Sequence, residues 1–338
     1  MEKKRSEEMQ QAELSIVVPV KNVEKTIGGV LRSVASQIVG IDAEVIVVDM
    51  GSQDRTILEG YQLLKELGLR GGVVRNGDND PGSALNTGLQ RANGTFVTFL
   101  FLHRLYRDFL NGYLQTARQG ADVVFGCDNA IGVRAAERRV ISTAVKNNTG
   151  ADFAYEVIRG NLTVDPAALM ARQEFLDQHH IQFREGTQYG MEEEFVFRCL
   201  LSGDTVLQAP TIPEKDDVFG GRYWGGALDS NETAGISVPG KEVFESVDAM
   251  IRIYDFIQLQ HRQKDELLML FRYQKFPESV MRCVDELLRQ GMDYRFIKGC
   301  IKRGGYQRLL ETDGKVTEAE LKRRVGIWKR LPWFYQPK

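Results

Sequence analysis

Three consecutive glutamates, Glu192–Glu194, stand directly before an apolar segment whose residues repeat with helical spacing. A glutamate that is partly buried by a bound substrate can have its pKa raised and can then act as a general base. Acidic residues are also favoured in the first turn of any helix, because they interact with the positive end of the helix dipole. The run therefore predicts a candidate base, with helix stabilisation as the alternative explanation for one or two of the three.

A second group of polar residues follows the first two predicted strands. Asn22 comes just after the first strand, residues 14–20, whereas Asp49, Ser52 and Asp54 end and follow the second. Because ligands bind at the carboxyl ends of strands in open α/β sheets, these side chains are expected to surround one site. The alternative is that Asp49 and Asp54 only cap their loop and the next helix.

A lone histidine, His103, ends the apolar run FVTFLFL, residues 96–102. An imidazole suits Mn²⁺ or Zn²⁺ better than Mg²⁺, and a single ligand holds any of these ions poorly. His103 is therefore a weak candidate metal ligand. The alternative is a strand-end residue that binds nothing.

Strands and helices alternate through the first part of the chain. Strands are expected at 14–20, 43–49, 72–76, 96–102 and 121–127, and helices at 21–37, 57–69 and 82–93. This alternation predicts an α/β fold with a mostly parallel sheet that is covered by helices on both faces. The middle of the chain, residues 128–235, is less regular, with helical patterns at 173–181 and 192–203 and a short strand at 205–210.

Beyond Gly240 the pattern becomes helical throughout. Amphipathic helices are expected at 241–261, 264–276, 277–291, 292–304 and 318–328, separated by glycine, proline or polar residues. The chain is therefore expected to comprise a flexible or helical tail at 1–12, an α/β domain at 13–235 and a helical domain at 236–338.

Composition limits the classes of function. The chain has 338 residues and a net charge of −2, so nothing in its overall charge favours nucleic acid or anionic membrane as a partner. It has no apolar run of the ~18 residues that a membrane span needs and no signal peptide at its N-terminus. The four cysteines are widely spaced and are expected to be reduced thiols. We therefore expect a cytoplasmic protein, whose basic, aromatic end at 328–338 could contact the inner face of a membrane or a protein partner.

Five segments, in this order, resemble family 2 glycosyltransferases, which have the GT-A (Rossmann-like) fold. They are SIVVPVKNVEKTIGGVLRSVASQ (15–37), EVIVVDMGSQDRT (44–56), GSALNTGLQRANGTFVTFL (82–100), LMARQEFLDQHHIQF (169–183) and FREGTQYGMEEEFVFRCLLSG (183–203). The resemblance implies transfer of a sugar from a nucleotide diphosphate donor to an acceptor hydroxyl, with inversion. The acceptor would be a glycan or a lipid-linked oligosaccharide in surface polysaccharide synthesis. The C-terminal hundred residues lie outside the resemblance.

The resemblance also implies roles for particular residues. Glu192 falls on the position of the catalytic base, and Glu193 is the alternative register. Contacts to the nucleotide-sugar are implied for Pro19, Val20, Asn22, Asp49, Ser52, Asp54, Asn86, Phe101 and His103.

Several positions depart from the family pattern. Met50 replaces an aspartate that typically reads the base, and Leu85 stands where an arginine is common. Phe101 and His103 replace the Asp-x-Asp pair that holds Mn²⁺ or Mg²⁺, so metal use is an open expectation. Arg104, Arg107 or Arg222 could neutralise the diphosphate instead.

Two further alternatives stay open. The glycine-rich loop 218–230, with Arg222, Tyr223 and Trp224, could close over the sugar or could simply connect two domains. The departures on the donor side also allow a degenerate relative, which would bind a nucleotide-sugar or a protein partner without transferring sugar.

Overall fold

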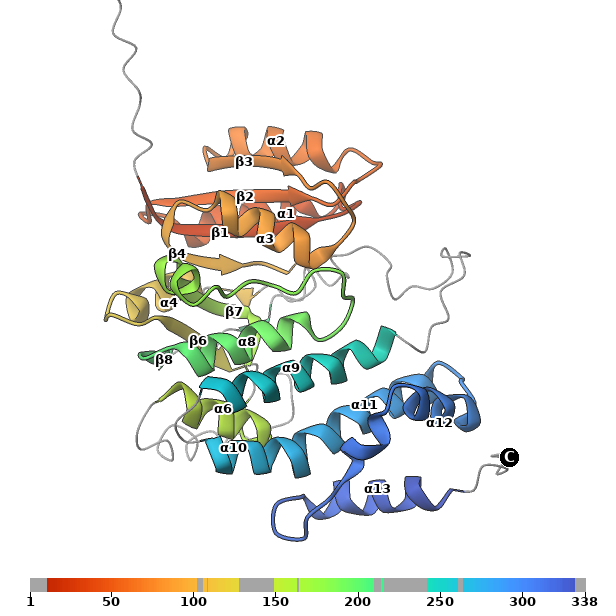
Figure 1. Ribbon diagram of the computed structural model, residues 1–338. Coiled ribbons are helices and arrows are strands. Elements are labelled where there is room, and N and C mark those ends of the chain that lie inside the picture. Colours follow the sequence, from red (N-terminus) through yellow and green to blue (C-terminus); the bar gives the residue numbers. More distant parts are fainter. Residues whose placement is uncertain are drawn as a thin grey trace, which may run out of the picture.

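The structure is a computed structural model that describes residues 11–101, 106–107, 109–127, 149–162, 164–209, 214–215, 242–260 and 264–331. A twisted sheet with flanking helices forms one part, and the C-terminal helices gather beside its β8 end, farthest from β3 and α2 (Figure 1). The predicted α/β class and the C-terminal helical region are both confirmed. None of the described helices is long and apolar enough to cross a membrane.

The main sheet has seven strands in the order β3-β2-β1-β4-β7-β6-β8. Neighbours β1–β2, β2–β3, β1–β4 and β6–β8 are parallel, and β7 is antiparallel to both β4 and β6. The strands are β1 (Ala12–Val20), β2 (Ala43–Asp49), β3 (Arg70–Arg75), β4 (Gly94–Phe99), β6 (Val123–Cys127), β7 (Val164–Arg172) and β8 (Val206–Gln208). A separate pair joins β5 (Tyr106–Arg107) and β9 (Glu214–Lys215).

The two strands that the sequence defines best form the centre of the parallel half. Every residue of β2 is buried, as is every residue of β1 except Glu13. Their continuous runs of valine and isoleucine fit strands that are covered on both faces. Val20 pairs in register with Asp49, so the loops behind both strands begin at the same edge of the sheet.

Strand β7 was missed by the sequence prediction, although it occupies the middle of the sheet. Its sequence, VDPAALMAR, contains a proline and five small or polar residues, so it lacks the β-branched run that marks β1 and β2. The predicted central strand was also too long, because β4 ends at Phe99 and Phe101 follows it outside the strand.

Helices cover the sheet as expected. They are α1 (Ile27–Gln37), α2 (Thr56–Glu66), α3 (Pro81–Arg91), α4 (Leu110–Ala117), α6 (Gly150–Ile158), α7 (Gln173–Gln178) and α8 (Met191–Ser202). Helix α3 begins with a proline preceded by Asp80, whose carboxylate accepts the backbone N–H of Gly82 at 3.1 Å. This is a regular N-cap and fixes the start of the helix.

The C-terminal region starts with η3 (Glu242–Phe244) and α9 (Glu245–Gln260), which packs along α8 (Figure 1). It continues with α10 (Lys264–Leu270), the π-helical segment η4 (Phe271–Lys275), α11 (Phe276–Arg289), α12 (Tyr294–Arg303), η5 (Tyr306–Leu310) and α13 (Ala319–Arg330). The predicted break at Pro277 was wrong. Proline needs no N–H partner in a first turn, so α11 starts around it directly after the π-helical segment.

The cysteine prediction is confirmed for the side chains that the structure describes. Cys199, Cys283 and Cys300 are free thiols, and the first two are buried. Burial raises the pKa of Cys283 to about 11, so this thiol stays protonated and unreactive near neutral pH.

Candidate functional site

The loops after β1 and β2 are joined to each other by hydrogen bonds. The backbone N–H of Asn22 donates to Ser52 Oγ at 2.9 Å, and the N–H of Gln53 donates to Asn22 Oδ1 at 2.9 Å. Asn22 has a φ of 51°, a left-handed conformation that asparagine tolerates better than most residues. The predicted residues Asn22 and Ser52 therefore lie together, and their side chains shape the loops.

Asp49 is completely buried at the end of β2. Its carboxylate accepts the N–H groups of Gly51 at 3.1 Å and of Ser52 at 3.2 Å, and Arg75 Nε lies 3.8 Å away. A carboxylate held by backbone donors in this way fixes the conformation of the loop. The structure thus gives Asp49 the capping role that the sequence had offered as the alternative.

Asp54 has a similar structural role. It accepts hydrogen bonds from Thr56 Oγ1 at 2.5 Å, from the N–H of Thr56 at 3.0 Å and from the N–H of Glu24 at 3.2 Å. Burial opposes the charge, but these hydrogen bonds outweigh it and lower the pKa of Asp54. Asp54 therefore ties the start of α2 to the loop that precedes α1.

Three further positions at this edge are buried. Pro19 and Val20 are covered at the end of β1, and Met50 is only 1% exposed. In this conformation the side chain of Met50 belongs to the core, so a base could pack on it only after the loop had moved.

Asn86 lies on α3 and connects the first half of the domain to the segment before α8. Its side-chain NH₂ donates to the carbonyl of Phe183 and to Glu185 Oε1, both at 2.9 Å, and its Oδ1 accepts the N–H of Phe183 at 2.9 Å. Asp80 adds a second link, since its Oδ2 accepts the N–H of Gly186 at 2.5 Å. The two partners of Asn86 are 97 and 99 residues away, so this contact brings the donor-side and acceptor-side segments together.

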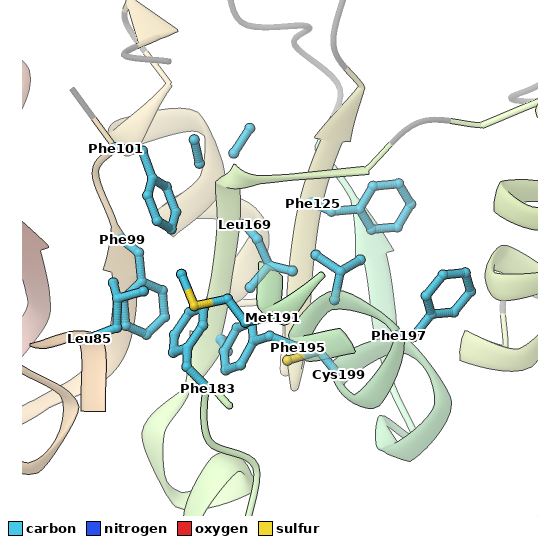
Figure 2. Close-up of a cluster of buried hydrophobic side chains, with 14 of the residues drawn as sticks. Leu85, Phe99, Phe101, Phe125, Leu169, Phe183, Met191, Phe195, Phe197 and Cys199 are labelled. Atoms are coloured by element: carbon cyan, nitrogen blue, oxygen red, sulfur yellow. The ribbon is translucent and has the colours of Figure 1, made fainter. Parts of the chain in front are cut away.

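An apolar cluster occupies the space between these segments (Figure 2). Phe183 stacks on Phe195 with ring centroids 4.0 Å apart, and Phe99 meets the edge of both rings at 4.9 and 5.5 Å. Leu85, Phe101 and Met191, at most 2% exposed, complete the cluster. Leu85 and Phe101 are two of the positions that depart from the family pattern. These two departures therefore share one packed cluster, whereas Met50 is buried separately after β2.

This packing decides how well the described residues fit a divalent cation. Phe101 takes the place of a carboxylate and is fully buried among apolar side chains, which offer no oxygen ligand. Among the described residues there is no group of three His, Cys, Asp or Glu side chains that could hold a metal ion. The described part of the site therefore does not fit Mn²⁺ or Mg²⁺. His103, Arg104, Arg222, Tyr223 and Trp224 lie outside the described residues, as does the side chain of Arg107.

The three glutamates of α8 have different surroundings. Glu192 is half-buried at the second position of the helix. The Glu193 carboxylate lies 2.6 Å from Lys275 Nζ and 3.1 Å from Arg282 Nη2. Burial would raise the pKa of Glu193, but the charges of Lys275 and Arg282 outweigh it and lower this pKa to about 2.

Glu194 is also held by cationic side chains. It is buried and lies 3.1 Å from Arg198 on its own helix and 2.7 Å from Arg252 on α9. The run MEEEF thus combines one candidate base with two structural carboxylates.

Lys275, Arg282 and Arg252 were missed by the sequence analysis, because they belong to the region outside the family resemblance. One signal was present: Lys275 and Arg282 are seven residues apart, which is close to two helical turns, so they share one face. Nothing in the sequence linked that face to α8.

The chain was compared with known proteins. A model of the family described as Glycosyl transferase family 2 matches residues 15–178. The PGL/p-HBAD biosynthesis glycosyltransferase of Mycobacterium tuberculosis is 36% identical over 86 residues, 25% of this chain and 33% of that protein. The poly(ribitol-phosphate) beta-N-acetylglucosaminyltransferase TarS of Staphylococcus aureus is 37% identical over 89 residues, 25% of this chain and 15% of TarS. The chain therefore matches a third or less of the length of these relatives.

The fold has a counterpart among solved structures. The crystal structure of S. aureus TarS 1–349 in complex with UDP-GlcNAc has a TM-score of 0.55 and 19% identity, over 85% of this chain and 83% of that one. The fold is therefore that of the GT-A glycosyltransferases, as the sequence predicted. Residues 15–178, just under half of the chain, match glycosyl transferase family 2.

Proposed function

We propose that the protein is a glycosyltransferase, which moves a sugar from a nucleotide diphosphate donor to an acceptor hydroxyl with inversion. The acceptor class that we propose is a glycan or a lipid-linked oligosaccharide of a surface polysaccharide. The family match supports this, and so do the names of the relatives, which act in PGL/p-HBAD biosynthesis and on poly(ribitol-phosphate). UDP-GlcNAc, which TarS 1–349 binds, is the first donor to test.

One observation carries the proposal. Helix α3, which carries the predicted donor residue Asn86, is hydrogen-bonded through that residue to Phe183 and Glu185, in the segment that leads into the helix of the proposed base. A transfer reaction needs these two halves at a fixed separation, because the base must be within hydrogen-bond reach of the attacking hydroxyl.

We assign the base to Glu192. Glu193 is the alternative, but a carboxylate with a pKa of about 2 is too weakly basic to take a proton efficiently near neutral pH. In the proposed step, Glu192 accepts the proton of the acceptor hydroxyl as its oxygen attacks the anomeric carbon. The bond from that carbon to the donor phosphate breaks, and the nucleoside diphosphate leaves.

The leaving diphosphate must be stabilised in a site whose described residues do not fit a cation. We propose that arginine side chains do this, with Arg104 and Arg222 as the predicted residues, because a guanidinium can pair with phosphate oxygens without a metal. His103 stays a weak candidate for a metal ligand.

Ligand binding and turnover test this proposal together. A panel of nucleotide-sugars is screened by thermal shift in EDTA and in Mn²⁺, and release of nucleoside diphosphate is then measured for any donor that binds. We expect one donor to stabilise the protein in EDTA, and Glu192→Gln to abolish release while donor binding persists. Donor binding that requires Mn²⁺ and is lost in His103→Ala would overturn the metal-free assignment.

A second candidate is a protein that binds a nucleotide-sugar without transferring the sugar. The apolar cluster favours it, because Leu85 and Phe101 remove polar groups at two positions of the family pattern. In that case the donor would stabilise the protein, but no acceptor preparation would increase nucleotide release above background.

A further inference from the structure

We infer that the C-terminal helical region positions the helix that carries the base, and that Lys275, Arg252 and Glu245 are the positioning residues. The inference rests on the proposed role of Glu192. It assigns a role in catalysis to a region that lies outside the family match, residues 15–178. Three independent contacts hold the start of α8, and each comes from a different place in the C-terminal region.

The first contact is the ion pair between Glu193 and Lys275. The Lys275 side chain is only 6% exposed, and its Nζ lies 2.6 Å from Glu193 Oε1. A buried ammonium group is costly unless it has a partner, so this lysine holds Glu193 in one place. Arg282, about two helical turns further along on the same face, lies 3.1 Å from the other carboxylate oxygen.

Lys275 is the last residue of the π-helical segment η4, in which two consecutive polar side chains are buried. Both Gln274 and Lys275, which are consecutive, are 5% exposed, whereas neighbouring residues of a regular helix diverge by about 100°. Gln274 Oε1 accepts the N–H of Glu318, so it faces the C-terminal helices while Lys275 faces α8. Single π-turns of this kind often occur at functional sites.

The second contact joins α8 to α9. Arg252 Nη2 lies 2.7 Å from Glu194 Oε2, and its Nε donates to the same oxygen at 2.8 Å. Arg198 holds the other oxygen of Glu194 at 3.1 Å. The Glu194 side chain is 6% exposed, so neither partner can swing away without leaving a buried charge.

The third contact holds the loop just before α8. Glu245 Oε2, at the start of α9, accepts the N–H of Gln188 at 2.6 Å and that of Tyr189 at 3.2 Å. Gly190 follows with a φ of 81°, and a Cβ added there would lie 2.7 Å from Ser246 Cα. The chain thus passes α9 at a distance that only glycine allows.

These contacts leave Glu192 little freedom. Contacts with the C-terminal region fix the chain on both sides of Glu192, at residues 188–190 before it and at residues 193–194 after it. A general base must lie within hydrogen-bond reach of the proton that it removes, and a displacement of ~1 Å can cost on the order of 100-fold in rate. The C-terminal region therefore sets the position from which Glu192 acts.

The test compares variants of full-length protein. Lys275→Met removes the charge and keeps a long side chain, Lys275→Arg restores the charge, and Glu245→Gln weakens the third contact. Arg272→Met is the matched control, because Arg272 lies on the same π-helical segment but forms an exposed pair with Glu311 at 2.8 Å. The measurements are kcat, KM for donor and acceptor, the donor Kd by calorimetry, and hydrogen exchange across residues 186–195.

We expect kcat to fall ~10- to 100-fold in Lys275→Met, as for a displaced catalytic group, with the donor Kd within about two-fold of wild type. Hydrogen exchange across residues 186–195 should become faster. Lys275→Arg should recover most of kcat, and Arg272→Met should match wild type.

The positioning role is refuted if Lys275→Met and Glu245→Gln both keep wild-type kcat, because each removes a different contact. A loss of thermal stability with unchanged kcat in the folded protein would mean that the contacts are merely structural. Failure of the proposed function looks different: wild type would then transfer no sugar, or Glu192→Gln would be as active as wild type.

Discussion

Replacing Glu193 by glutamine should destabilise the protein in a way that depends on pH. The carboxylate pKa is about 2 in the folded protein against a reference value of 4.5, because Lys275 and Arg282 stabilise its charge. That difference of 2.5 units, at about 1.36 kcal/mol each, corresponds to about 3 kcal/mol of stability at neutral pH. Since glutamine keeps the size but not the charge, Glu193→Gln should lose about this amount at pH 7.

The sign follows from proton uptake. Between pH 4.5 and pH 2 the unfolded chain binds the proton at this position and the folded chain does not, so wild-type stability falls with falling pH in this window. The contribution is fully present above pH 4.5 and is lost as the pH approaches 2. The variant lacks the stabilisation from the ionised Glu193 carboxylate, so its free energy of unfolding should depend less on pH over the same range.

Urea unfolding of wild type and Glu193→Gln at pH 7, 5, 4 and 3 measures the effect. We expect a gap of about 3 kcal/mol at pH 7 and 5 that shrinks at pH 4 and again at pH 3. Glu320→Gln serves as the control, because Glu320 forms an exposed pair with Arg323. A gap at pH 7 that stays constant down to pH 3 would refute the ion-pair explanation and would point to lost packing.

Three further changes test other parts of the site. Asp49→Asn should lower the free energy of unfolding in urea by about 1.5–3 kcal/mol and weaken donor binding in calorimetry, because the buried carboxylate no longer holds the loop amides. An unchanged donor Kd would contradict the role of Asp49 in loop geometry. Phe101→Ala should cost about 3–5 kcal/mol, since it opens a cavity in the apolar cluster; a change below about 1 kcal/mol would mean that Phe101 is not packed there. Asp80→Ala should cost about 1 kcal/mol and speed hydrogen exchange at Gly186, its second partner; unchanged exchange would contradict that link.

The sequence predicted best those strands and helices whose own residues determine their secondary structure. The strands β1 and β2 are continuous valine and isoleucine runs, so their position, burial and parallel pairing could be predicted. The same holds for the amphipathic helices of the C-terminal region. Strand β7 could not be recognised, because its place between β4 and β6 is set by its neighbours and not by its own alanine-rich sequence.

The candidate site shows the same division. The residues of the family motifs could be named from the sequence, but their contacts could not. Asp49 and Asn86 matched ligand-binding positions, yet their side-chain atoms are bonded to the protein's own backbone. Only the ion pair between Glu193 and Lys275 distinguishes Glu193 from Glu192 as the candidate base. Lys275 lies about 80 residues away, on a segment that no motif connects to α8. Long-range pairing of charges leaves no local pattern in a single sequence.

The central claim is that Glu192 is the base of a sugar transfer. The most direct measurement is release of nucleoside diphosphate from the donor that binds, with and without a lipid and glycan extract as acceptor, for wild type, Glu192→Gln and Glu193→Gln. We expect acceptor-dependent release by wild type, a loss of at least ~100-fold in Glu192→Gln, and a smaller loss in folded Glu193→Gln. Equal release by wild type and Glu192→Gln, or a larger loss in Glu193→Gln, would contradict it.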